Sequence, residues 1–136
     1  MTDRSLLLIK PNAVQHHHVG HIISIVEDHG FKLRDIKIFQ FTPASAEEFY
    51  EAHRGKEFFE RLVRFMCSGE TIALLLERND AVELLRELVG DADPAKRAPH
   101  TIRASYAEGV TENAVHASDS IAAAKREIKL IFGANY

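Results

Sequence analysis

The residues Ser5-Leu6-Leu7-Leu8-Ile9-Lys10-Pro11-Asn12 predict a buried strand near the start of the chain. An almost wholly apolar run of this length is typical of a strand inside a sheet, where both faces are covered. The Pro-Asn pair predicts a turn directly after the strand. The basic side chain of Lys10 is therefore expected at a strand end.

The apolar pattern changes its period after this strand. Apolar residues recur at helical spacing from Val19 to Val26, and Gly30 supplies a stop, so a helix is predicted there. Residues 31–41 then alternate between apolar and polar, with one phase shift near Asp35, as in a long strand with a bulge or bend. The chain therefore begins with the order β-α-β.

Two helices and a second apolar strand are predicted next. The first helix starts at Thr42-Pro43-Ala44-Ser45, with Ser45 and Glu48 as a capping box. The second helix ends at Ser68-Gly69. Residues 71–76 are again nearly all apolar, which favours another buried strand.

The following segment combines a helix with a long loop. Asn79 or Asp80 is expected to cap a helix that runs to Val89, with Gly90 after it. Residues 91–100 have the composition of a loop, and a loop of this length in a small domain is more often functional than idle.

The end of the chain completes the predicted fold. Val110, Ala114 and Val115 indicate a short strand around His116, and the last helix is expected over residues 121–132. The order β-α-β-α-α-β-α-β-α fits an α/β (α+β) fold of the ferredoxin-like βαββαβ type. We expect a four-stranded antiparallel sheet covered by helices, with an extra helix pair, in a single domain spanning residues 1–136.

Composition excludes several classes of protein. The chain has 136 residues, of which 46% are hydrophobic and 27% charged, as in a soluble globular domain. A net charge of −3 argues against general attraction to nucleic acid. We predict a cytoplasmic protein, because no apolar run could cross a membrane or serve as a signal peptide, and Cys67 has no second cysteine for a disulfide.

The stretch Asn113-Ala114-Val115-His116-Ala117-Ser118-Asp119-Ser120 places a histidine at the end of a strand. The Ser-Asp-Ser segment predicts the cap of the last helix, and anions are readily held near a helix N-terminus. A histidine in this context suits a nucleophile. A satisfied core or edge histidine is the alternative, and the local sequence does not choose between them.

Basic side chains elsewhere suggest an anion as the ligand. Lys10 ends the first strand, Arg86 lies on the helix before the loop, and Arg103 follows the loop. Arginine binds phosphate in a forked geometry and lysine adds a point charge, so the set matches a polyphosphate. Each cation taken singly could equally be a solvated surface charge.

Several motifs, in the same order along about 120 residues, carry a family resemblance. They are Leu8-Ile9-Lys10-Pro11-Asn12-Ala13-Val14, Gly55-Lys56-Glu57-Phe58-Phe59, Ser68-Gly69, Asp93-Pro94-Ala95 with Thr101-Ile102-Arg103, and Asn113-x-x-His116-x-Ser118-Asp119-Ser120. With these motifs the chain resembles nucleoside diphosphate kinases.

The resemblance implies a ping-pong transfer through a phosphohistidine. His116 would accept the terminal phosphate of a nucleoside triphosphate such as ATP and pass it to a nucleoside diphosphate. Glu127 would orient the imidazole, although an ordinary solvent-facing helix residue is the alternative there, and Tyr50 would flank the histidine. The residues implied to bind the nucleotide are Lys10, Phe58, Arg86, Ala92, Arg103 and Asn113.

The resemblance also implies a cofactor and an assembly. Mg²⁺ would be held through the nucleotide phosphates rather than in a protein cage. The protein would form a homo-oligomer, a tetramer or a hexamer built from dimers. Stacking of the base on Phe58, with few hydrogen bonds, predicts broad nucleotide specificity.

The chain departs from the family pattern at several positions. Ala92 stands where a phosphate-binding threonine is usual, and Ala117 where glycine is usual, so Ala117 would be strained if its φ were positive. Asn12 replaces an aspartate. The segment Ala104-Ser105-Tyr106 replaces a Gly-Asp-Phe segment, which affects subunit packing more than chemistry.

Two alternatives stay open at this stage. His16-His17-His18 with His21 could mark a metal site, although three adjacent histidines cannot point the same way and a polar turn is favoured. The same fold could also serve as a non-catalytic nucleotide-binding or regulatory module. Such a module would have no need of His116 as a nucleophile.

Overall fold

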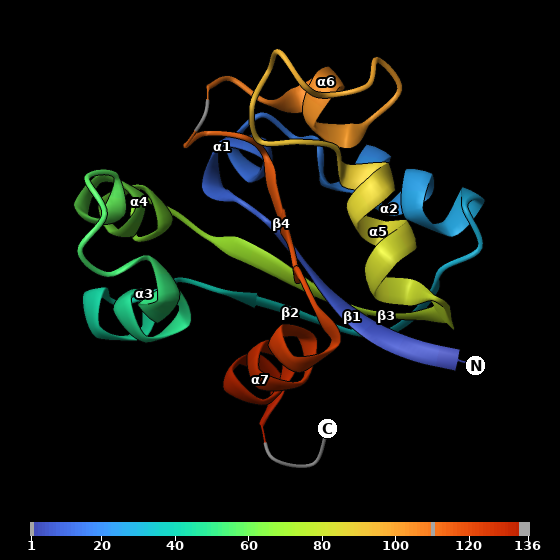
Figure 1. Cartoon of the computed structure of the whole chain (residues 1–136), viewed down its shortest axis with the longest axis horizontal. Helices are drawn as coiled ribbons and strands as arrows, with labels where there is room; N and C mark the ends of the chain where they lie inside the picture. Colours follow the sequence, from blue (N-terminus) through green and yellow to red (C-terminus); the bar gives the residue numbers. More distant parts are fainter. Residues whose placement is uncertain (1, 110, 134–136) are drawn as a thin grey trace.

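A four-stranded antiparallel sheet forms the centre of the molecule (Figure 1). The structure is a computed structural model and describes residues 2–109 and 111–133. The sheet has the order β2-β3-β1-β4, and each neighbouring pair runs antiparallel. Its strands are β1 (Thr2–Ile9), β2 (Lys32–Phe39), β3 (Thr71–Asn79) and β4 (Val115–Ala117). The predicted fold class is confirmed.

The strand β1 divides the core into two halves. Leu6, Leu7, Leu8 and Ile9 are all completely buried. Because successive side chains of a strand point to opposite faces, Leu6 and Leu8 join one apolar cluster, while Leu7 and Ile9 join the other. Both faces of β1 are therefore covered, which explains why its sequence is continuously apolar.

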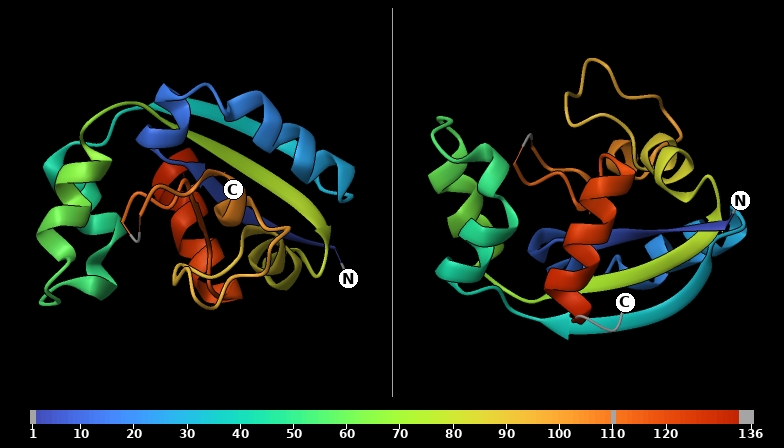
Figure 2. Two further views of the ribbon diagram at one scale, coloured as in Figure 1. Left: turned by 90° about the horizontal axis from the view of Figure 1, so that it is seen from above. Right: turned by 60° about the horizontal axis from the view of Figure 1, so that its bottom comes forward.

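Helices cover both faces of the sheet and join these clusters together with residues of β3. One cluster draws on α2 (Val19–Asp28) and α5 (Ala81–Val89). The other draws mainly on α3 (Pro43–Phe49), α4 (Phe59–Met66) and α7 (Ile121–Phe132). Figures 1 and 2 show α3 and α4 together at one end of the molecule, apart from α5. They form the predicted extra helix pair, and the turn η1 (Glu51–His53) lies between them.

The predicted bulge of β2 is present in the structure, whereas the predicted capping box of α3 is displaced. The pairing of β2 with β3 shifts its register between Leu33 and Asp35, which confirms the predicted bulge. The capping box, however, lies one turn earlier than predicted. Thr42 Oγ1 accepts from the Ser45 N–H and Ser45 Oγ accepts from the Thr42 N–H, because Thr42 and not Ser45 precedes the first helical residue.

Two five-residue helices differ from the sequence prediction. Helix α1 (Pro11–Gln15) replaces the expected turn, because proline also fits the first position of a helix. Helix α6 (Ile102–Tyr106) lies where no helix is predicted, and Thr101 caps it by accepting from the Ala104 N–H. Helices this short contain too few residues to establish an apolar period.

Backbone angles near the last strand also differ from expectation. The conditional strain at Ala117 is absent, since its φ is not positive, whereas Ala114 has a φ of +78°. Asp80 precedes α5 as predicted, but its side chain makes no capping hydrogen bond and its φ is +54°. Val110, which was assigned to the last strand, falls outside the described residues. Within those residues, no helix is both long and apolar enough to span a bilayer.

Candidate active site

His116 lies on β4 with its imidazole held by a buried carboxylate. Its backbone pairs with Leu8 of β1, and its side chain is 19% exposed. The Nε2 atom lies 2.8 Å from Oε1 of Glu127 on α7. Because a carboxylate only accepts, Nε2 carries the hydrogen in this contact, and the lone pair of the neutral imidazole is left on Nδ1.

Glu127 is itself fixed by a second hydrogen bond. Ser118 Oγ donates to the same Oε1 atom at 2.8 Å. His116 and Ser118 are two residues apart, so strand alternation places both side chains on one side of the chain. Glu127 shares the buried face of α7 with Ala124, Ile128 and Ile131, at helical spacing. It is therefore a buried helix residue, and the solvent-facing alternative is wrong.

The helix that carries Glu127 starts where the sequence predicts. Ser120 precedes α7, and its Oγ accepts from the Ala123 N–H at 3.0 Å. This cap turns the chain directly from β4 into the helix. Only Ser118, Asp119 and Ser120 therefore connect β4, which carries His116, to α7, which carries Glu127.

Two aromatic rings from the end of α3 pack against His116. The ring centroids of Phe49 and Tyr50 lie 5.1 Å and 5.7 Å from that of His116, both edge-on. Tyr50 is 4% exposed, and its hydroxyl has no hydrogen-bond partner within residues 2–109 and 111–133. Burial raises the pKa of Tyr50, and Glu127 adds to the shift, so the phenol stays neutral.

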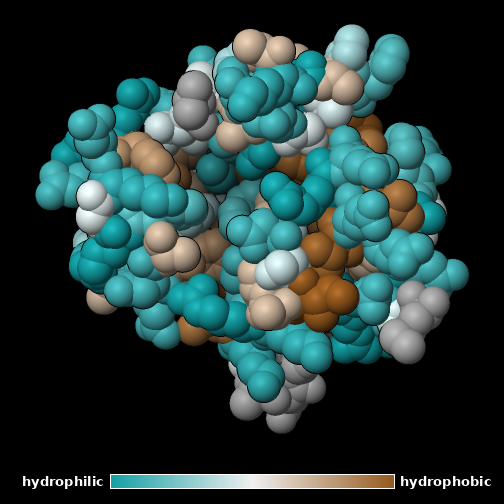
Figure 3. All heavy atoms as spheres, viewed as in Figure 1, coloured by the Kyte–Doolittle hydropathy of each residue, from teal (hydrophilic) through white to brown (hydrophobic). Residues whose placement is uncertain are grey.

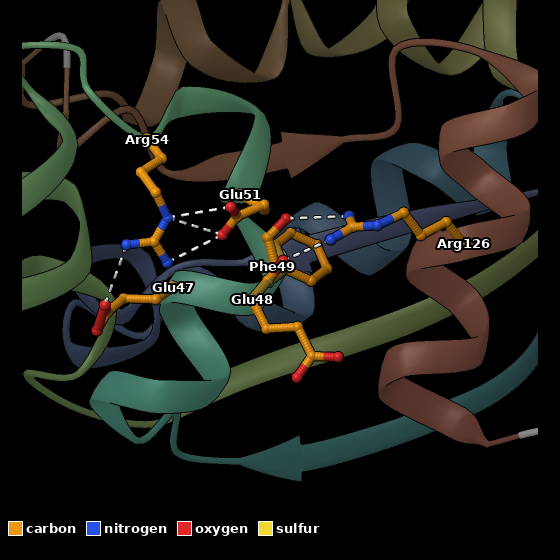
Figure 4. Close-up of polar contacts among 6 residues, drawn as sticks. All are labelled: Glu47, Glu48, Phe49, Glu51, Arg54 and Arg126. Atoms are coloured by element: carbon orange, nitrogen blue, oxygen red, sulfur yellow. Dashed lines mark hydrogen bonds and ion pairs between the residues drawn. The ribbon is translucent and has the colours of Figure 1, made fainter.

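The end of α3 is anchored to α7 by an arginine (Figure 4). Arg126 donates to the carbonyl oxygens of Glu48 and Phe49, the latter at 3.2 Å. These carbonyls belong to the last turn of α3, which has no helical partner for them. Arg126 precedes Glu127, so α7 holds both the imidazole of His116 and the helix end that packs against it.

A second arginine stabilises the helix pair internally. Figure 4 shows Arg54 turned toward Glu47 and Glu51, with Nε of Arg54 3.0 Å from each carboxylate oxygen of Glu51. These groups are largely exposed, so their attraction is screened by water. Arg126, and not Arg54, therefore anchors the end of α3 to α7.

The predicted cations surround the same strand end. Lys10 is 4% exposed, and its backbone N–H donates to the Ala114 carbonyl at 2.8 Å. Burial lowers the pKa of Lys10 to about 7, with a further contribution from the positive charge of Arg103. Asn113 is also buried.

Arg103 is held on both sides by backbone carbonyls. Its Nη1 donates to Gly90 at 2.8 Å and its Nη2 to Val115 at 3.0 Å. Burial lowers the pKa of Arg103 to about 10, with Arg97 contributing, so it stays charged at neutral pH. Arg86 lies further out, with Nη1 3.4 Å from the Asp119 carbonyl.

A cleft of about 590 Å³ opens beside His116. It is lined by four of the predicted residues: Arg86, Ala92, Arg103 and His116. Figure 3 shows a recess bordered largely by hydrophilic residues on the face of the molecule seen in Figure 1. Arg86, Lys96 and Arg103 in its lining, with the imidazole of His116 beside them, suit a phosphorylated ligand, although Glu87, Asp91 and Asp119 also line the cleft.

The other predicted residues do not line this cleft. Lys10, Tyr50 and Asn113 are nearly buried, whereas Phe58 is 44% exposed just before α4. The ring of Phe58 lies 5.3 Å from that of His53 and carries Lys56 Nζ at 5.8 Å from its centroid. The exposed part of the Phe58 ring remains accessible to a flat ligand.

His53 and Ser118 are site residues that the sequence analysis missed. His53 lines the cleft, and burial lowers its pKa, with the charges of Lys56 and His116 contributing. Its position in the turn between Tyr50 and Phe58 was the available signal. For Ser118 the signal was its two-residue spacing from His116.

The histidine-rich segment makes other contacts. His16 Nδ1 lies 2.7 Å from Glu108 Oε1, and the rings of His18 and Tyr106 are 4.4 Å apart. His21 Nδ1 lies 3.1 Å from the Tyr106 hydroxyl. In the described ranges no group of three or more histidine, cysteine or acidic side chains is arranged to hold a metal ion.

Comparisons with known proteins agree on one family. The family model described as nucleoside diphosphate kinase matches residues 3–136. A nucleoside diphosphate kinase from Staphylothermus marinus is 45% identical over 131 residues, which cover 96% of this chain and 93% of the relative.

Solved structures show the same relationship. The nucleoside diphosphate kinase of Aquifex aeolicus superposes with a TM-score of 0.93 and is 41% identical, covering 97% of this chain and 96% of that one. The enzyme from Halobacterium salinarum, solved in complex with CDP, gives a TM-score of 0.94 at 34% identity, covering 99% and 90%.

Proposed function

The chain belongs to the nucleoside diphosphate kinase family, and on that premise we propose that His116 is the residue that carries the phosphoryl group. As a member of this family, the protein is a phosphotransferase that moves the terminal phosphate of a nucleoside triphosphate to a nucleoside diphosphate. The observation that supports His116 is its contact with Glu127, which leaves Nδ1 as the available nucleophile.

The transfer divides into two matched steps. In the first, the Nδ1 lone pair attacks the terminal phosphorus, a P–N bond forms, and the bond to the bridging oxygen breaks with its electron pair on the departing diphosphate. In the second, a terminal oxygen of another diphosphate attacks the phosphohistidine and the P–N bond breaks. Imidazole serves both steps, because it is a nucleophile at neutral pH and its phosphoramidate stays reactive.

Glu127 and Ser118 act through the imidazole. When Nδ1 bonds to phosphorus, positive charge develops on the ring, and the carboxylate 2.8 Å from Nε2 stabilises it. Ser118 holds that carboxylate in place. Tyr50 limits the rotation of the ring by packing edge-on against it.

The basic residues bind the nucleotide and offset the charge of the transition state. Arg86 and Arg103 line the cleft and face the phosphates, while Lys10 adds a buried charge beside Ala114. We assign the base to Phe58 and a polar contact with the nucleotide to Asn113. Ala92 lines the phosphate side without a hydroxyl group to contribute.

Mg²⁺ is the proposed cofactor, carried by the nucleotide. The donor set fits this arrangement, since the described residues hold no three-ligand metal group, while Arg86, Lys96 and Arg103 in the cleft would hold the phosphate oxygens that ligate the ion. When bound, the ion neutralises charge between adjacent phosphates.

We also propose a homo-oligomer, either a tetramer or a hexamer, that is built from dimers, with cytoplasmic residence and a single domain over residues 1–136. Ile36 and Ile38 are 45% and 61% exposed on β2, an edge strand of the sheet. Exposed apolar residues on an edge strand favour pairing with another chain. A mass from light scattering tests the assembly. The unpaired Cys67 suits a reducing compartment.

The proposed role of His116 is tested by incubation with γ-labelled ATP and Mg²⁺. We expect an acid-labile, base-stable label on the wild type that is discharged by a nucleoside diphosphate, and none on His116→Ala. A folded wild type that takes up no label, or a variant that labels normally, would refute the assignment and leave a non-catalytic nucleotide-binding module as the alternative.

A further inference from the structure

The loop between α5 and α6 has no helix or strand of its own. It covers residues 91–101 and projects from the body of the molecule (Figures 1 and 2). Five of its residues line the cleft: Asp91, Ala92, Lys96, Ala98 and Thr101. Its backbone hydrogen bonds and Asp side-chain contacts are local, joining residues two or three positions apart. Local bonds shape such a loop but do not fix it against the cleft.

A single arginine ties the two ends of this loop together. Arg97 Nε donates to the Asp91 carbonyl at 3.1 Å, and its Nη2 donates to the Ala92 carbonyl at 2.7 Å. Its Nη1 donates to the Arg103 carbonyl at 3.1 Å. One planar group therefore holds three carbonyl oxygens, two at the start of the loop and one just after its end.

The contacts continue from the loop to the proposed nucleophile. Arg103, whose carbonyl Arg97 holds, donates from its own guanidinium to Gly90 and to Val115. Val115 precedes His116 in β4. Arg97 and Arg103 together thus connect the loop, the end of α5 and the strand that carries His116.

The charges of the two arginines, joined through the Arg103 carbonyl, also favour an anion in the cleft. The charge of Arg97 contributes to lowering the pKa of Arg103. Arg86 acts in the same direction and the Asp91 carboxylate offsets part of the repulsion, so a bound anion would relieve what remains. A phosphate chain in the cleft supplies that anion.

We propose that Arg97 is a positioning residue, which sets the affinity of the cleft for nucleotide phosphates by holding loop 91–101 against it. This inference rests on the proposed function, because it takes the cleft to be the nucleotide site. Lysine cannot replace Arg97 fully, since an ammonium group lacks the forked geometry that reaches three separated carbonyls.

The test compares Arg97→Met and Arg97→Lys with the wild type. In Arg97→Met we expect the dissociation constant for ADP, measured by calorimetry, and the KM for ATP to rise by about tenfold, with kcat within about twofold. Arg97→Lys should recover less than half of the loss. Arg64→Met is the matched control, because Arg64 is an exposed arginine on α4 outside the cleft, and it should bind ADP like the wild type.

Several results would overturn the proposal. They are unchanged ADP affinity in a folded Arg97→Met, wild-type affinity in Arg97→Lys, or a fall in kcat without a change in KM. If Arg97→Met does not fold, the comparison rests on Arg97→Lys, together with hydrogen exchange of peptides from residues 91–103. Exchange there should be faster than in the wild type, and equal exchange contradicts the proposal. Calorimetry measures ADP binding without turnover, so it tests the role of Arg97 alone. The labelling of His116 tests the proposed phosphotransfer separately.

Discussion

Glu127 Oε1 lies 2.8 Å from Nε2 of His116, although the two residues come from different elements. The contact places the ring hydrogen on Nε2 and leaves the lone pair of the neutral imidazole on Nδ1, the proposed nucleophile. Glu127→Ala is expected to slow the phosphorylation of His116 by about 10² to 10³-fold, because the ring loses both its orientation and its compensating charge. KM should change much less.

The measurement for Glu127 is the single-turnover rate at saturating ATP. Ser118→Ala is the companion variant, since Ser118 touches only the carboxylate and not the ring in these contacts. It should slow the step less than Glu127→Ala does. A Glu127→Ala enzyme with the wild-type rate would show that the carboxylate does not support the nucleophile.

Lys10 links stability to pH. Its pKa falls from an ordinary 10.5 to about 7 because the folded state buries it. Between these two values the unfolded chain binds more protons than the folded one, so this group makes stability rise with pH from about 7 toward 10. Below pH 7 both states are protonated and the full destabilisation by the buried charge is present.

The Lys10 effect is measured by urea unfolding of the wild type and Lys10→Met. The variant should be more stable than the wild type at pH 6, and this advantage should shrink at pH 9. The same stability difference at both pH values would mean that Lys10 titrates normally in the fold.

Nucleotide binding should reverse the pKa shift of Lys10. Phosphate beside the amine favours the charged form, so ADP binding at pH 8 is expected to take up protons. Calorimetry in buffers of different ionisation enthalpy reports this uptake, which Lys10→Met should abolish. Equal binding enthalpies in all buffers for the wild type would contradict the prediction.

Ala114 and Ala117 should respond oppositely to glycine. Ala114 has φ +78°, where alanine is strained by about 1 kcal/mol relative to glycine, whereas Ala117 sits in β4 without a positive φ. Ala117→Gly should therefore destabilise the protein by about 0.5–1 kcal/mol. Ala114→Gly should be the more stable of the two variants, as judged by urea midpoints. The reverse order would locate the strain at Ala117.

Arg126 should control the mobility of the end of α3. Arg126→Met removes the donors to Glu48 and Phe49, so amide exchange in residues 46–50 is expected to accelerate. Arg54→Met is the control, because Arg54 contacts the side chains of Glu47, Glu51 and Phe59 rather than the carbonyls that Arg126 holds. It should leave exchange at the α3 end nearly unchanged. If amide exchange in residues 46–50 accelerated equally in both variants, Arg126 would have no special role in holding the end of α3.

The sequence pattern was most informative where one physical rule dominates. The continuous apolar run of β1 predicts coverage on both faces, and the phase shift near Asp35 predicts the bulge in β2. The cap at Ser120 also follows from local sequence, whereas the role of His116 needed the motifs spread along the rest of the chain. These features depend on periodicity or on neighbours in the chain.

Features that depend on contacts between distant residues could not be predicted from the sequence. Arg126 holds carbonyls 77 and 78 positions away, and Ser118 meets a carboxylate nine positions on that only the fold brings to it. The positive φ lies at Ala114 and not at Ala117. The Ala114 carbonyl accepts from the backbone N–H of Lys10, which is more than 100 positions away in the sequence. Periodicity carries no information about such pairs, because tertiary packing determines them.

The position of the phosphoryl group on the imidazole tests the central claim most directly. The wild type is phosphorylated with ATP and Mg²⁺, and nitrogen-edited NMR of ¹⁵N-histidine-labelled protein identifies the ring atom bonded to phosphorus. Because Nε2 donates to Glu127, the bond is expected at Nδ1 of His116. Phosphorus on Nε2, or on another residue, would contradict the account.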